Sequence, residues 1–235
     1  MNTETEVRLV GGLAFLFVLY SLWMGQVKIQ GLPGGYPNPV LALELVKNGA
    51  DIDAINQAEG GKARAFIRAS LFKDFGYIFV YTLLFVFLSL LLSRMNFSWA
   101  RGAGWIAATC AVVAAVLDLI ENRGMLRAIA GEVSDSLASN IRYSSLAKWG
   151  FLFIFSLLVG LLLVSRRDLF AIPALFFLLA ALLGLSGVIM NLLRPRFYWM
   201  FPAAIMSLGI AVSVLAVVFI FWPGKFLNKL PAFVA

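Results

Sequence analysis

The sequence predicts an all-α membrane protein with about six transmembrane helices, four in a bundle and the last two as a C-terminal helix pair. Hydrophobic residues make up 62% of the 235 residues and charged residues only 13%, against roughly 25% charged in a soluble domain. The apolar residues fall into runs near the roughly 20 residues that a helix needs to cross a bilayer. The chain begins with the acidic stretch MNTETEVR. This start does not resemble a cleaved signal, so we expect the first run to stay as an anchor.

Hydropathy places the spans at about 9–24, 71–92, 104–120, 146–164, 169–193 and 199–222. We expect residues 1–165 to hold the four-helix bundle with an outer helical cap at about 26–70, and residues 166–235 to hold the helix pair. The basic turn RPRFYW between the last two spans is short, which favours an antiparallel pair.

The long segment after the first span predicts turns followed by two short helices. It opens with GLPGGYPNP, whose glycines and prolines suit turns and extended backbone. Asn38 is expected to cap a helix VLALELVKN that starts at Pro39 and ends at Gly49. Asp51 is expected to cap a second helix, IDAINQA, before the two glycines at 60–61. These short amphipathic helices would lie on the outer membrane surface and cover the bundle.

Lysine and arginine in the short loops set the expected orientation. One side of the drawn topology carries Arg94, Arg101, Arg166, Arg167, Lys225 and Lys229. By the positive-inside rule, this side is cytoplasmic and both termini are inside. The opposite side also carries arginines, which weakens the asymmetry: Arg123, Arg127, Arg142, Arg194 and Arg196.

Composition disfavours several classes of function. The chain has no histidine, the commonest ligand of haem iron, zinc and copper, so we expect no haem, metal or other cofactor. The net charge of +7 comes mainly from basic residues at the ends of apolar runs, which is typical of membrane anchoring and disfavours nucleic-acid binding. Neither a Gly-rich phosphate loop nor a G-x-S-x-G nucleophile motif is present.

Polar residues inside the spans predict a site at their outer ends. An ionisable residue costs about 2.5 to 3.5 kcal/mol on insertion into a bilayer, so such residues tend to face a bundle interior or a wet cavity. Residues three and four positions apart share a helix face. One face of the second span, one face of the third span and a lysine at the start of the fourth span carry such residues. The ligand-binding candidates are Asp74, Tyr77, Tyr81, Asp118, Glu121, Asn122 and Lys148.

A purely structural interpretation stays open for these residues. Asp118 and Lys148 would then form an ion pair that fixes the register of the bundle. Glu121 would lie at headgroup depth and pair with Arg123 or Arg127. The two tyrosines would be packing aromatics.

The motifs D-x-x-Y-x-x-x-Y in DFGYIFVY, LDLIEN, and a lysine in SSLAKWGF resemble a group of uncharacterised bacterial integral membrane proteins. The resemblance covers roughly the first 165 residues and implies four spans with a long first outer loop. It implies a bacterial inner membrane as the location, and it implies no reaction. The matching positions are Asp74, Tyr81, Asp118, Glu121, Asn122 and Lys148.

Three functions are compatible with the sequence. The first is a protein whose polar cluster binds a lipid headgroup or small amphiphile, or docks a membrane protein partner as an accessory subunit. The second is a membrane-embedded lipid-modifying enzyme, with Asp118 or Glu121 as general base and Lys148 or Tyr81 stabilising developing negative charge. The third is a transporter, which ranks last because its charges are expected nearer the bilayer midplane.

Overall fold

The computed structural model describes residues 3–25, 27–36, 38–166, 168–194 and 198–227. Within these ranges, the helices long and apolar enough to cross a membrane are α1 (Thr3–Met24), α3 (Gly49–Leu92), α4 (Ala100–Ala130), α5 (Asp135–Val164), α6 (Ala171–Leu193) and α7 (Met200–Phe221). Shorter helices are η1 (Pro33–Gly35), α2 (Pro39–Glu44) and α8 (Pro223–Leu227). The prediction of an all-α multi-pass membrane protein is therefore confirmed.

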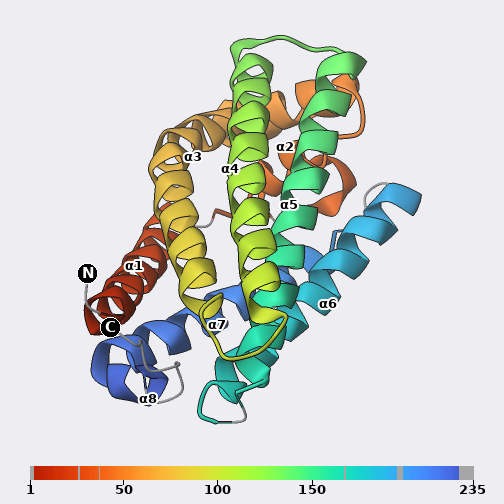
Figure 1. The fold of residues 1–235 in the computed structure, drawn as a ribbon. Helices are drawn as coiled ribbons and strands as arrows, with labels where there is room; N and C mark the ends of the chain where they lie inside the picture. Colours follow the sequence, from red (N-terminus) through yellow and green to blue (C-terminus); the bar gives the residue numbers. More distant parts are fainter. Residues whose placement is uncertain (1–2, 26, 37, 167, 195–197, 228–235) are drawn as a thin grey trace.

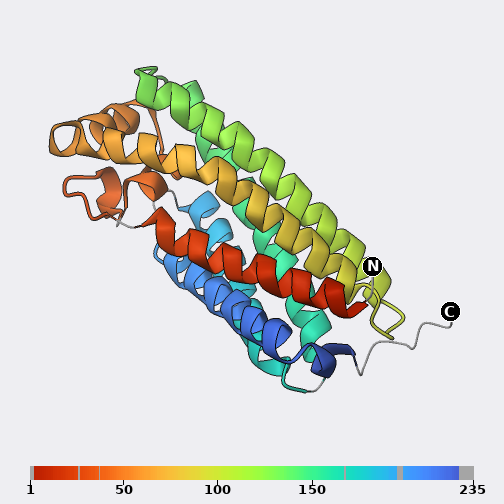
Figure 2. The ribbon, with the colours of Figure 1, turned by 90° about the vertical axis from the view of Figure 1, so that its left-hand side faces the viewer.

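The long helices pack as a closed ring. In chain order α3 packs on α4, α4 on α5, α5 on α6 and α6 on α7, and α1 contacts both α7 and α3 (Figures 1 and 2). The C-terminal pair α6 and α7 thus fills the space between α5 and α1. Aromatic side chains fill much of the interior; Phe85 of α3 stacks on Phe155 of α5 with 4.3 Å between ring centroids.

The helices α4 and α5 extend beyond the spans that hydropathy indicated. The polar stretch expected between residues 120 and 146 is mostly helical, because α4 continues to Ala130 and α5 starts at Asp135. Gly131 ends α4 in the left-handed region (φ 109°), and the Ser134 side chain accepts the Leu137 N–H at the start of α5. At about 1.5 Å per residue, a 31-residue helix is longer than the roughly 30 Å hydrocarbon core.

The helical cap packs against these extensions. Asn38 caps α2 as expected, accepting the N–H groups of Val40 and Leu41. The expectation that this helix reaches Gly49 was wrong, because α2 ends at Glu44. The residues of α2 apart from Val40 are buried, and α2 contacts α3, α4 and α5. It is therefore inserted into the bundle end and does not lie free on the membrane surface.

The second cap helix is the first part of α3. Asn48, and not Asp51, caps it by accepting the Asp51 N–H. The backbone breaks where Glu59 and both following glycines adopt positive φ, so α3 is a cap helix joined to a spanning helix. Asp135 accepts the Gly49 N–H, which fixes the cap to the start of α5.

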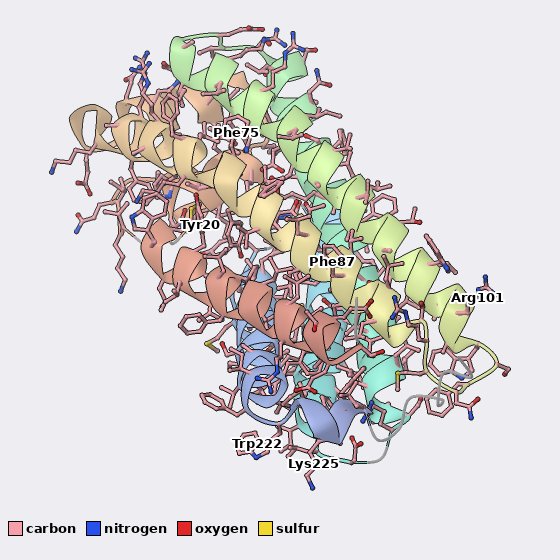
Figure 3. All side chains as sticks on the ribbon, turned by 60° about the vertical axis from the view of Figure 1, so that its left-hand side comes forward. Tyr20, Phe75, Phe87, Arg101, Trp222 and Lys225 are labelled. Carbon is pink, nitrogen blue, oxygen red and sulfur yellow. The ribbon has the colours of Figure 1, made fainter. Side chains whose placement is uncertain are left out.

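The two ends of the ring differ. The start of α1 and the short helix α8 lie together at one end, and the cap and the α4–α5 turn lie at the other (Figure 1). Around the ring, apolar side chains face outward; Phe75, Phe87 and Trp222, labelled in Figure 3, are all exposed. This surface suits contact with lipid.

Candidate functional site

Lys148 on α5 is the centre of a buried ion cluster. Its Nζ lies 2.8 Å from Glu121 Oε2, 3.1 Å from Asp118 Oδ1 and 3.3 Å from Glu44 Oε1. The Lys148 side chain is 4% exposed, so these contacts are shielded from solvent. An ammonium group has three N–H donors, and each carboxylate can take one. The cluster joins α2, α4 and α5.

Neutral donors extend the cluster to α3. The Tyr81 hydroxyl donates to Asp118 Oδ2 at 2.9 Å, so both oxygens of this carboxylate are bonded. The Asn122 amide donates to Asp74 Oδ2 at 2.6 Å. Four elements of the ring and cap therefore meet through one polar network.

A cavity of about 360 Å³ lies beside the cluster. Its charged lining residues are Glu44, Asp74, Asp118 and Lys148, from four different helices. The lining also includes Gly25 and Ile205, and the Ile205 side chain is 39% exposed at the start of α7. The cavity thus connects buried charges with the protein surface near the C-terminal end of α1 and the N-terminal end of α7.

Aromatic rings form one wall of this cavity. Phe17 of α1 stacks on Tyr77 at 5.2 Å between centroids, and Tyr77, Tyr81 and Phe85 follow one another along α3 at 5.8 and 5.7 Å. These positions recur every four residues, which places them on one helix face. Trp149 lines the cavity from α5, and its Nε1 donates to Glu44 Oε2 at 3.0 Å.

The structure brings all the predicted site residues into one neighbourhood, but they have different positions in it. The cavity wall includes Asp74, Tyr77, Tyr81, Asp118 and Lys148. Glu121 and Asn122 are fully buried behind this wall.

The expected pairing of Glu121 with Arg123 or Arg127 was wrong. Glu121 contacts Lys148 instead, and Arg127 pairs with Glu132 at the start of the α4–α5 turn. The two sets of residues lie on different faces of α4. Asp118, Glu121 and Asn122 lie on its inward face, whereas Arg123 and Arg127 are exposed.

Sequence analysis missed two members of the cluster, Glu44 and Trp149. Glu44 was assigned to a surface helix, where an acidic residue needs no explanation. One signal was present: Glu44 is the single charged residue within the helix PVLALE. A lone charge among apolar residues favours a buried partner.

Some buried polar atoms of the cluster lack hydrogen bonds within the described residues. Glu121 Oε1 and Asn122 Oδ1 have no hydrogen-bond partner there, and neither side chain is exposed. Unpaired buried polar groups are costly, so native structures retain few of them. Such groups occur here together, next to the cavity.

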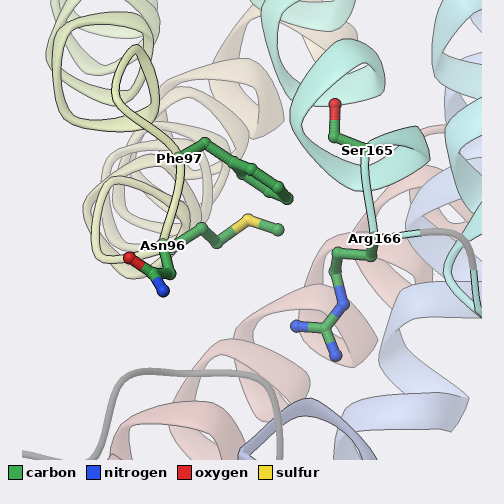
Figure 4. Close-up of a pocket in the computed structure, with 5 residues that line it drawn as sticks. Asn96, Phe97, Ser165 and Arg166 are labelled. Atoms are coloured by element: carbon green, nitrogen blue, oxygen red, sulfur yellow. The ribbon is translucent and has the colours of Figure 1, made fainter.

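A second cavity, of about 330 Å³, lies at the opposite end of the ring (Figure 4). It is lined by residues of the α3–α4 and α5–α6 connections, including Phe97 and Arg166. The Arg166 guanidinium already donates to Asp168 and to the carbonyls of Lys225 and Phe226. Burial lowers the pKa of Arg166, and Asp168 opposes that shift. We therefore place the candidate site in the first cavity.

The arrangement suits binding better than acid–base chemistry. A general base needs a free carboxylate oxygen within reach of its substrate. Asp118 uses both oxygens within the network, and Glu121 does not line the cavity. Asp74 lines the cavity and is not among the carboxylates that contact Lys148.

Comparison with known proteins gives no assignment: the chain matches no protein-family model, no curated protein sequence and no solved structure.

Proposed function

We propose that the protein binds a membrane amphiphile, with the polar head of the ligand in the cavity beside Lys148. The membrane is a bacterial inner membrane, and the termini are cytoplasmic. The observation that carries the proposal is one cavity that combines buried charges, a wall of aromatic rings and a lining residue exposed on the side of the ring. Ligand sites commonly combine mostly apolar walls with a few convergent polar groups.

The position of Ile205 supports entry from the membrane. It lines the cavity, whereas the next residue, Met206, is 64% exposed on the outer side of α7. An amphiphile that enters there can place its chain near α7 and its head near Asp74. The apolar chain then contacts apolar side chains, and the polar head contacts polar ones.

Neighbouring tryptophan substitutions on α7 test this proposal. Ile205→Trp adds bulk at the cavity lining, and Met206→Trp adds the same bulk outside it. We expect added native lipid extract to raise the melting temperature in detergent of the wild type and of Met206→Trp, but not of Ile205→Trp. Equal stabilisation of all three proteins would show that lipid acts elsewhere, and the proposal would be wrong.

A further inference from the structure

Acidic groups outnumber basic groups around the cavity. Among the described residues, the carboxyl groups of Glu44, Asp74, Asp118 and Glu121 gather around Lys148 as their shared cation. Buried charges are normally paired, because an unpaired ion loses its hydration without compensation. A second positive group in the cavity would therefore balance part of this acidic excess.

Asp74 is the carboxyl group that such a positive group would contact. Lys148 already contacts three other carboxylates, and Asp74 receives a neutral amide N–H from Asn122. Asp74 lines the cavity, whereas Glu121 lies behind it. A positive group in the cavity would reach Asp74 without displacing Lys148.

The aromatic wall suits the same kind of group. Phe17, Tyr77, Tyr81 and Phe85 line the cavity next to Asp74 and Asp118. A cation over the face of an aromatic ring is attracted by the ring quadrupole, and aromatic cages that bind quaternary ammonium groups use this attraction. An anionic head would instead meet the carboxyl groups of the lining, because Lys148, the cation of the lining, already contacts three carboxylates.

Two oxygen atoms of the cluster that lack hydrogen-bond partners also favour a positively charged ligand. Glu121 Oε1 and Asn122 Oδ1 are acceptors, fully buried and without a hydrogen-bond partner in the described part of the chain. Unused acceptors favour a donor or a cation.

We propose that the ligand head is positively charged, a protonated amine or a quaternary ammonium group, held between Asp74 and the aromatic wall. This inference rests on the proposed function and specifies the ligand class of the same cavity.

Binding of matched probes to the full-length protein in dodecyl maltoside tests the sign of the charge. The probes are radiolabelled dodecyltrimethylammonium, dodecyl phosphate and tetramethylammonium, each at a low mole fraction relative to detergent. We expect saturable binding of dodecyltrimethylammonium, with affinity at least about tenfold above that of either other probe, equivalent to about 1.4 kcal/mol.

Two variants locate that binding. Asp74→Asn removes the wall carboxylate and keeps an oxygen that can accept from Asn122, so we expect it to weaken dodecyltrimethylammonium binding about tenfold or more. Asp53→Asn removes an exposed carboxylate of the cap and should bind as the wild type does. Melting temperatures without probe check that both variants fold. The comparison of probes on the wild type stands whether or not a variant folds.

The outcomes separate the two proposals. Preferred binding of dodecyl phosphate would overturn the positive headgroup and leave amphiphile binding in place. Equal binding of tetramethylammonium and dodecyltrimethylammonium would support the positive group and count against an amphiphile. Saturable binding of none of the probes would overturn the inference, and the lipid stabilisation of Met206→Trp would then decide the proposed function separately. Unchanged binding by Asp74→Asn would also overturn the assigned position.

Discussion

At the scale of single residues, the cluster depends on Lys148. Three carboxylates from α2 and α4 converge on its ammonium group, which is buried. Removing one partner of a buried ion pair leaves an uncompensated charge, which commonly costs about 3–5 kcal/mol. Lys148 therefore contributes to stability whatever the cavity binds.

Replacing Lys148 tests this role. Lys148→Met should lower the free energy of unfolding by about 3–5 kcal/mol, because the acids lose their shared cation. Asp118→Asn should cost less, since an amide oxygen can still accept from Tyr81. The double variant should lose less than the sum of the single losses, because Asp118 and Lys148 are in contact. Strict additivity in a reversible unfolding assay would contradict the pairing.

The two tyrosines should differ in their contribution. Tyr81→Phe removes a hydrogen bond to a buried carboxylate, which is worth about 1.5–3 kcal/mol. Tyr77→Phe removes a hydroxyl whose contact is a 3.3 Å hydrogen bond from Ser21, so we expect a loss below about 1 kcal/mol. Chemical denaturation of both variants gives the comparison, and a larger effect at Tyr77 would be inconsistent with the network.

Residue-level prediction from the sequence succeeded where the spacing was informative. The i, i+3, i+4 pattern of Asp118, Glu121 and Asn122 placed them together on one buried helix face. Glu44 lay beyond that reasoning, because its contact with Lys148 joins positions that are 104 residues apart. Spacing within one helix carries no information about such a contact.

At the scale of elements, close helix packing depends on a few glycines. A Cβ at Gly184 of α6 would lie 2.3 Å from the ring of Phe153 on α5. That ring is fully buried and packs between Trp149 and Phe201, so it has little room to move. A Cβ at Gly150, also on α5, would meet no atom within 4 Å.

These two glycines give a matched pair. Gly184→Ala should destabilise the protein by about 1–3 kcal/mol through overpacking. Gly150→Ala should be neutral or stabilise by up to about 1 kcal/mol through helix propensity. Thermal melting in the same detergent tests both variants. Equal melting temperatures would contradict the described packing of α5 on α6.

Hydropathy predicted which elements exist better than where they end. It identified each of the spanning helices, but α4 and α5 continue past the apolar runs through polar residues. Apolar character reports the segment in contact with lipid or core, whereas a helix ends where capping residues such as Gly131 and Ser134 occur. The capping residues therefore predict the helix ends better than hydropathy does.

At the scale of the whole molecule, the ring gives the protein two different ends. One end holds the start of α1 and α8, and the other holds the cap over the cavity. The ring closure by α6 and α7 did not follow from the sequence, because it depends on long-range contacts between α7 and α1. These contacts also place Ile205 at the cavity.

Cysteine labelling tests the orientation. The native Cys110 is buried and would be replaced by alanine in the background protein. Val133→Cys lies in the α4–α5 turn and Ser98→Cys in the α3–α4 connection, at opposite ends. In intact spheroplasts, an impermeant maleimide should label Val133→Cys, and it should label Ser98→Cys only after permeabilisation. The reverse pattern would place the termini outside.

The most direct test of amphiphile binding is an experimental structure of the wild type purified from its native membrane in mild detergent. We expect elongated non-protein density in the cavity, with one end within about 4 Å of the Asp74 carboxylate and the other toward Ile205, because a charged hydrogen bond or ion pair requires that approach. A cavity that contains only water, or one closed by inward movement of α7, would contradict amphiphile binding at this site.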